Sequence, residues 1–277
     1  MMWFLLILLL VLVLVLGLWI LLLCSRRDYP VWEKLSKFSY AYRGYHNKPT
    51  VPENSMAAFR RALQNYYGVE LDVHLMADGN LAVIHDSSLK RTAGAEVEIE
   101  DLTKADLENY RLEGTEEKIP LFSEVLRLFE GKTPLIVELK TARGNYAALT
   151  EAACAMLDRY DVSYCIESFD PRCLMWLKKH RPDVVRGQLS HAFLKKGKDG
   201  GQSLPMRFVL QLMLLNCLAR PDFVAYCLED RNCLSVALCR KIYKVQEVNW
   251  TIKTKEEMEE AERLGNLVIF EQFDPRG

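Results

Sequence analysis

The chain opens with an unbroken apolar run and continues as short β-rich segments that alternate with helical patterns. Residues 1–24 contain no charged side chain and consist almost entirely of Leu, Val, Ile, Met, Phe and Trp. About 20 apolar residues, at about 1.5 Å of helical rise each, span the hydrocarbon core of a bilayer. The pattern predicts a transmembrane anchor over residues 1–24, a juxtamembrane linker over residues 25–37 and one domain over residues 38–277.

A cleaved signal peptide is the main alternative for the apolar run. It requires a basic start, a shorter apolar core and small residues at the cleavage site, and none of these is present. Arg26 and Arg27 follow the run directly, so the positive-inside rule predicts a single-pass protein of the cell membrane with its domain in the cytoplasm. The opposite topology is the alternative. We expect three aromatic residues to lie at the membrane interface: Trp19, Tyr29 and Trp32.

The β-rich runs number nine and are separated mostly by helical patterns. They cover Phe38–Arg43, Val69–His74, Leu81–His85, Leu135–Lys140, Tyr164–Phe169, Val184–Leu189, Asp222–Tyr226, Glu247–Ile252 and Leu267–Phe270. The helical patterns include Ser55–Asn65, Ser123–Phe129, Tyr146–Tyr160, Pro171–His180, Pro205–Leu218 and Lys255–Leu264. This alternation indicates a parallel sheet with crossover helices.

Only a short turn links Val69–His74 to Leu81–His85, which is too short for a parallel crossover and predicts a hairpin. Eight parallel strands remain, which favours a TIM (β/α)8 barrel with its functional groups at the carboxyl ends of the strands. A doubly wound open sheet is the alternative, although no G-x-G-x-x-G or P-loop supports it. The Pro205–Leu218 pattern is apolar nearly all round. We interpret it as a covered barrel helix, with a membrane-contacting patch as the alternative.

Composition narrows the classes of protein that fit. The 277 residues carry 36 basic and 37 acidic side chains, a formal net charge of −1, which argues against nucleic-acid binding by bulk charge. After Cys24, seven cysteines remain without a C-x-x-C pair. This number and spacing suit neither a disulfide framework nor a zinc site, and they agree with a reducing compartment.

Acidic residues gather at the ends of two predicted strands. Glu70 and Asp72 alternate on one strand and therefore share a face, and Glu138 ends another strand with Lys140 two residues further on. Buried neighbouring carboxylates repel one another unless a proton or a cation lies between them. Three convergent oxygen ligands suit a hard divalent cation, Mg²⁺ or Ca²⁺.

Two further residues carry chemistry near these acids. Arg43 ends the first strand, where its guanidinium can bind phosphate in bidentate fashion. His85 closes the accessory strand, where an imidazole can transfer protons near neutral pH.

These residues carry a resemblance to the glycerophosphodiester phosphodiesterase family. Its ordered motifs are similar to Ala41-Tyr42-Arg43-Gly44, Pro52-Glu53-Asn54, Glu70-Leu71-Asp72-Val73, His85-Asp86, Glu138-Leu139-Lys140, Ser168-Phe169-Asp170 and Trp250-Thr251. The resemblance implies a metal-dependent TIM barrel that releases glycerol 3-phosphate and an alcohol from glycerophosphodiesters or lysophospholipid head groups. It implies these roles by position: Glu70, Asp72 and Glu138 for the metal, Arg43 and Lys140 for the phosphate, His85 for proton transfer, and Glu53 and Trp250 for the substrate pocket.

The chain departs from the family pattern at its first histidine, which is Tyr42 here. A phenol can donate a proton to a leaving alkoxide but is a poor base at pH 7, so His46 or His74 is an open alternative. A catalytically silent protein that binds phosphodiesters or lipid head groups is a second hypothesis. The family also usually places a Thr-Asp pair where residues 271–275 read Glu-Gln-Phe-Asp-Pro.

Overall fold

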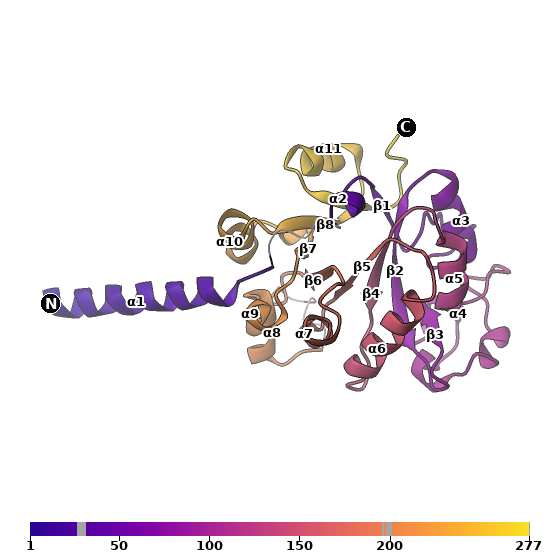
Figure 1. Cartoon of the computed structure of the whole chain (residues 1–277), viewed down its shortest axis with the longest axis horizontal. Coiled ribbons are helices and arrows are strands. Elements are labelled where there is room, and N and C mark those ends of the chain that lie inside the picture. Colours follow the sequence, from indigo (N-terminus) through magenta and orange to yellow (C-terminus); the bar gives the residue numbers. More distant parts are fainter. Residues whose placement is uncertain (27–31, 196, 198–200, 277) are drawn as a thin grey trace.

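The computed structural model describes residues 1–26, 32–195, 197 and 201–276. Arg27 and Tyr29 of the predicted linker lie outside the described residues. Helix α1, Met2–Leu22, extends away from the domain (Figure 1) and is the one described helix that is long and apolar enough to cross a membrane.

All nine expected strands are present. They are β1 Tyr40–Tyr42, β2 Gly68–Leu75, β3 Leu81–Val83, β4 Leu135–Leu139, β5 Tyr164–Ser168, β6 Arg186–Ser190, β7 Phe223–Cys227, β8 Gln246–Ile252 and β9 Leu267–Phe270. Eight of them form a closed parallel barrel in the order β1-β9-β8-β7-β6-β5-β4-β2, which β1 closes by pairing with β2. β3 pairs antiparallel with β2. The prediction of a TIM barrel with an accessory hairpin is confirmed.

Helices cover the outside of the barrel (Figure 1). They are α3 Met56–Gln64, α4 Lys90–Ala93, α5 Phe122–Phe129, α6 Tyr146–Leu157, α7 Pro171–His180, α8 Leu204–Gln211, α9 Asn216–Ala219, α10 Leu234–Tyr243 and α11 Lys255–Arg263. Short 3-10 turns cover Ile99–Asp101, Asp106–Asn109 and Leu228–Asp230. The expected helix over Pro205–Leu218 is wrong in length, because the chain leaves helical geometry at Met213, where φ is 53°. Its expected burial is also wrong, because no residue of α8 is buried.

Strand side chains divide between two cores. Those that face the helices, such as Val69, Leu71 and Val137, form the larger cluster, and those that face the lumen, such as Ile136 and Val248, form a smaller one. A Cβ at Gly187 would lie 2.1 Å from the Phe223 ring, so glycine at this position leaves room for an aromatic side chain in the lumen.

The short helix α2, Trp32–Leu35, contacts the lumen core. The Trp32 and Phe223 rings lie 5.0 Å apart, and the Tyr40 hydroxyl donates a hydrogen bond of 2.9 Å to the Leu35 carbonyl. The expectation that Trp32 lies at a membrane interface is therefore wrong. Apolar side chains fill this part of the lumen, and the polar side chains gather nearer the carboxyl ends of the strands.

Candidate functional site

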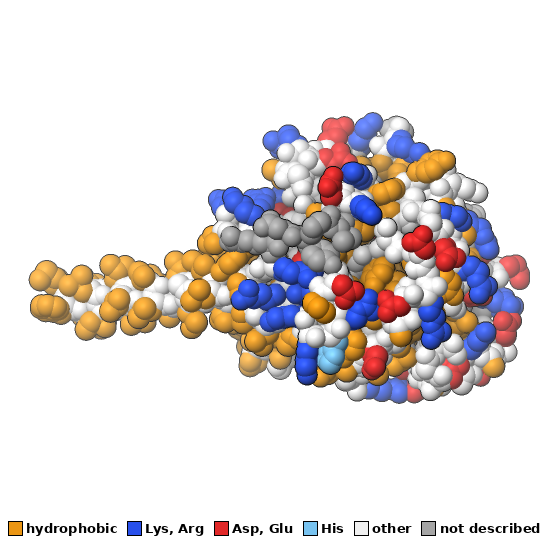
Figure 2. Space-filling view, in the orientation of Figure 1, with side chains coloured by type: hydrophobic (Ala, Val, Ile, Leu, Met, Phe, Trp, Pro, Cys, Tyr) orange, Lys and Arg blue, Asp and Glu red, His pale blue; other side chains and the backbone are white. Residues whose placement is uncertain are grey.

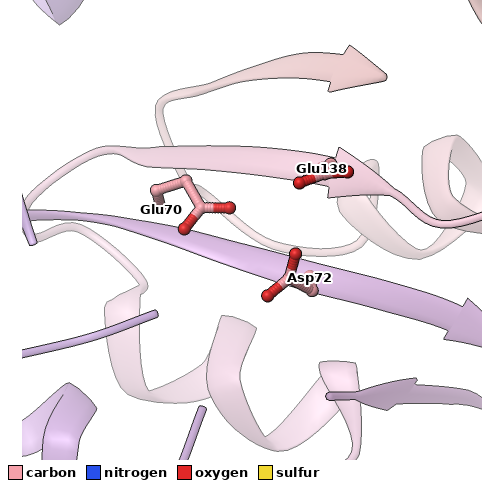
Figure 3. Close-up of side chains that lie close together, drawn as sticks. All are labelled: Glu70, Asp72 and Glu138. Carbon is pink, nitrogen blue, oxygen red and sulfur yellow. The ribbon is translucent and has the colours of Figure 1, made fainter. Parts of the chain in front are cut away.

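Three carboxylates meet inside the barrel. Glu70 and Asp72 project from β2 toward Glu138 on the neighbouring β4 (Figure 3), as the alternation of strand side chains requires. Their oxygens lie within 4.8 Å of one another, and all three side chains are buried. The structure thus brings together the three acids that the sequence predicted as a group.

The charges of this trio are only partly balanced by the protein. Burial raises the pKa of Glu70, and the charge on Asp72 raises it further. Burial also raises the pKa of Glu138, although Lys140 opposes this. Oε1 of Glu70 is buried and accepts no hydrogen bond from the described part of the chain. A buried carboxylate oxygen without a donor, beside two more carboxylates, fits a hard divalent cation.

Two cations flank the trio. The Lys140 ammonium lies 2.7 Å from Glu138 and 3.1 Å from Asp72. The Arg43 backbone N–H donates to Glu70 at 3.1 Å, and its guanidinium Nε lies 3.5 Å from Asp72. Nearby carboxylates raise the Lys140 pKa despite the opposing effect of burial. Both side chains therefore stay charged and place positive groups beside the acids, where a phosphate can bind.

Glu53 binds three cationic side chains at once. It accepts hydrogen bonds from Arg43 at 2.8 Å and Arg91 at 2.7 Å, and Lys48 lies 2.7 Å away. Burial acts to raise the Glu53 pKa, but these partners hold it well below its usual value of 4.5. Glu53 therefore fixes the orientation of Arg43, while Asn54 donates to Asp72 at 2.8 Å.

Tyr42 precedes the three acids in the sequence and His85 lies between Asp72 and Glu138. Both side chains line a cavity of about 220 Å³ with Glu70 and Glu138. His85 Nδ1 lies 2.5 Å from Asp86 Oδ1, which orients the ring. The Tyr42 hydroxyl accepts a hydrogen bond from Arg43. Burial raises the pKa of Tyr42 well above 10.0, so its phenol stays protonated at neutral pH.

The two alternative histidines have different surroundings: His74, unlike His46, lines a cavity of about 690 Å³ together with His85 and Lys140. His46 is buried, and its Nε2 is 3.5 Å from Glu271, one of the residues where the chain departs from the family pattern. It lines neither of the described cavities beside the acids. His74 has both ring nitrogens engaged, Nδ1 with Glu100 at 2.6 Å and Nε2 with the His85 carbonyl at 3.1 Å. Its contacts support the position of His85.

Sequence reasoning missed two residues of the site. Glu167 on β5 pairs in register with Glu138, is buried and lines the smaller cavity, where burial raises its pKa. The alternation in Tyr164–Ser168 carried this signal, because Glu167 has the lumen-facing parity. His191 follows β6 and lines both the smaller cavity and an adjoining cavity of about 690 Å³. No motif marked His191, and only the closed barrel brings it beside Trp250, with their rings 6.4 Å apart.

The barrel and its polar edge define a (β/α)8 protein of the kind whose active site lies at the carboxyl ends of the strands. The chain belongs to the glycerophosphoryl diester phosphodiesterase family, whose sequence profile matches residues 43–270.

Curated relatives agree with this assignment. A glycerophosphodiester phosphodiesterase of Caldanaerobacter subterraneus subsp. tengcongensis is 33% identical over 159 residues, which cover 54% of this chain and 65% of the relative. Lysophospholipase D GDPD1 of Homo sapiens is 28% identical over 176 residues, covering 59% of this chain and 49% of the relative. The alignments thus span less than two thirds of the length of these relatives.

Solved structures share the fold. A phosphodiesterase of Oleispira antarctica in complex with the product sn-glycerol-3-phosphate superimposes with a TM-score of 0.70 at 21% identity, covering 87% of this chain and 94% of the other. A glycerophosphodiester phosphodiesterase of Thermotoga maritima superimposes with a TM-score of 0.62 at 23% identity, covering 88% and 96%.

Proposed function

We propose that the chain is a membrane-anchored, metal-dependent phosphodiesterase. It hydrolyses glycerophosphodiesters, or the head groups of lysophospholipids, to glycerol 3-phosphate or its acylated form and an alcohol. The observation that carries this proposal is the convergence of three buried carboxylates with Arg43 and Lys140 in one cavity region of a family barrel. The curated relatives carry names that refer to both substrate classes.

The proposed roles follow the geometry. Glu70, Asp72 and Glu138 would hold Mg²⁺ or Ca²⁺, which when bound would neutralise charge on the phosphate. Arg43 and Lys140 bind phosphate oxygens through charge-assisted hydrogen bonds. Either water attacks phosphorus directly, or a glycerol hydroxyl attacks it and water then opens the resulting cyclic phosphate. In both routes the bond from phosphorus to the leaving alcohol oxygen breaks, and that oxygen takes up a proton.

His85 is the residue that we assign to proton transfer, because Asp86 fixes its ring at the cavity wall. Trp250 lines the same cavity, and its buried indole N–H has no hydrogen-bond acceptor among the described residues. It would contact the glycerol moiety and offer it this donor.

The direct test is turnover by the full chain in detergent. With Mg²⁺ or Ca²⁺ it should release glycerol 3-phosphate from glycerophosphocholine, and EDTA should abolish the release. Turnover that survives both EDTA and Glu70→Ala would contradict the metal role. Absence of turnover with either cation would contradict the enzymatic proposal.

A silent binding protein is the second candidate, and Tyr42 favours it because a protonated phenol replaces a family histidine. In that case Arg43 and the acids serve binding alone. A gain of about tenfold or more in turnover for Tyr42→His, from a barely active wild type, would support the silent protein.

We also propose that α1 anchors the chain in the cell membrane as a single span. Its side chains are exposed along the helix, and the described Arg26 follows it within a few residues. The positive-inside rule favours a barrel on the cytoplasmic side.

A further inference from the structure

The helix α8 contacts the segment after β6 through two polar side chains, and no residue of α8 is buried. Arg207 Nε donates to the Phe193 carbonyl at 2.8 Å, and Gln211 Oε1 accepts from the Leu194 N–H at 2.8 Å. Leu204 and Phe208, which share a face, are 57% and 47% exposed, and Met206 on the opposite face is 40% exposed. A barrel helix normally buries its apolar side chains, whereas those of α8 remain at least partly exposed.

The segment that follows α8 contacts the membrane anchor. The Trp19 indole N–H of α1 donates to the Leu212 carbonyl at 3.0 Å, and the Tyr243 hydroxyl of α10 donates to the Ile20 carbonyl at 2.6 Å. Leu23 and Met213 belong to one buried cluster. Figure 1 shows α1 leaving the domain next to α9 and α10, and Figure 2 shows hydrophobic side chains on the adjoining domain surface.

Charge at the same place suits a bilayer surface. Lys178 and Arg220 are exposed and line a hollow together with Cys24 and Ser25, directly after the apolar helix. Basic side chains at the end of a membrane span are attracted to anionic lipid head groups. The anchor therefore brings the segment that follows α8 close to the proposed membrane surface.

The same segment also forms a wall of the larger cavity. Met206, Leu210 and Leu215 line the cavity of about 690 Å³ together with His85 and Lys140. The cavity therefore joins apolar side chains of this segment to residues of the proposed phosphate site. Such a lining suits a single-chain phospholipid, which has a phosphate and an acyl chain in one molecule.

We propose that α8 and the segment that follows it bind the acyl chain of a lysophospholipid taken from the anchoring bilayer. This inference rests on the proposed function, because the phosphate of the same molecule binds at Arg43 and Lys140. It assigns to this chain a preference for lysophospholipids over water-soluble glycerophosphodiesters. The apolar wall lowers KM for substrates with a longer chain and leaves the reacting groups unchanged.

The test compares glycerophosphocholine with lysophosphatidylcholines whose acyl chains have from about six to about ten carbons, using the full chain in nanodiscs. Each fully buried methylene contributes about a fourfold gain in affinity at most. We expect kcat/KM to rise by about tenfold or more along the series. The double variant Met206→Gln with Leu210→Gln should lose this rise while its kcat/KM for glycerophosphocholine stays within about twofold of wild type.

Leu264→Gln is the matched control, because Leu264 is 39% exposed and follows α11, well separated from α8 in Figure 1. It should retain the full chain-length dependence. A wild type without chain-length dependence, or a folded double variant that keeps it, would overturn the inference.

The two proposals fail in different ways. If the protein hydrolyses glycerophosphocholine but shows no preference for acylated substrates, only the acyl-chain site is disproved. If neither substrate is hydrolysed, the proposed activity fails, and equilibrium binding of the same lipid series still tests the site. Affinity that does not change with chain length would then overturn it.

Discussion

Arg91 donates a hydrogen bond of 2.7 Å to Oε1 of Glu53, the same oxygen that accepts a hydrogen bond from Arg43. Arg91 also donates to Asp86 at 2.5 Å, and Asp86 contacts His85. A continuous line of charged groups therefore joins the proposed phosphate-binding arginine to the proposed proton-transfer histidine.

Arg91→Ala should lower kcat/KM about tenfold to a hundredfold, because a charge-assisted hydrogen bond to a partly buried group contributes about 1.5–3 kcal/mol. The loss should appear with every substrate, since Arg91 orients groups that all substrates use. Steady-state kinetics with glycerophosphocholine measures it. Lys90→Ala is the control, because the neighbouring Lys90 forms an exposed ion pair with Glu96. Equal losses in both variants would show that the line of charges has no special role.

Glu70→Gln should stabilise the cation-free protein and abolish its response to metal. Burial and neighbouring acids raise the Glu70 pKa, so keeping this carboxylate charged costs folding free energy above its usual pKa of 4.5. A neutral amide removes that repulsion and also removes a ligand. In EDTA the variant should melt at a higher temperature than wild type, and Mg²⁺ or Ca²⁺ should raise the melting temperature of wild type alone. Glu259→Gln, on the exposed face of α11, should show neither change. A variant that retains the metal-induced shift would refute the assignment of Glu70 as a ligand.

Glu53→Gln should reduce the loss in the free energy of unfolding that occurs as the pH falls into the acid range. The folded pKa of Glu53 is lowered from 4.5 by its cationic partners. The contribution of Glu53 to the free energy of unfolding is therefore complete above pH 4.5, and it disappears as the pH falls toward the lower pKa of the folded state. Denaturant unfolding between about pH 7 and about pH 3 should show a less stable variant near neutrality and converging curves in acid. Parallel curves would mean that Glu53 is not responsible for this pH dependence.

Substitution of the histidines should separate the proton-transfer residue from the structural ones. We expect His85→Gln to lower kcat by about a hundredfold or more. His46→Gln should change kcat little, because His46 lines neither described cavity beside the acids. His191→Gln is informative, since His191 lines both cavities. If kcat falls as much in His191→Gln as in His85→Gln, His191 is a second catalytic group. It would then take the role of the family histidine that Tyr42 replaces. The pH profile of kcat should lose one limb in that case.

A protease-cleavable tag fused after Gly277 tests the topology. The basic residues after α1 predict an N-out, C-in orientation, so the tag should resist external protease in intact cells and be cut after permeabilisation. Digestion without permeabilisation would place the barrel outside the cell. A periplasmic or extracellular protein with the same tag shows that the protease is active.

The sequence by itself determined the order of the barrel strands, the β2–β3 hairpin and the acidic trio. Strand alternation has a period of two, so Glu70 and Asp72 must share a face, and the turn after residue 75 is too short for any crossover. Motif order also determined the family. All eight cysteines are free in the structure.

Only the tertiary structure decided which residues meet across the barrel and which apolar surface stays open. Glu167 and His191 join the site because closure brings distant strand ends together, which no local pattern encodes. The apolar pattern over residues 205–218 predicted burial, but burial depends on whether a neighbouring element covers a helix. Here no residue of α8 is buried, and the segment after it contacts the anchor through the Leu212 carbonyl.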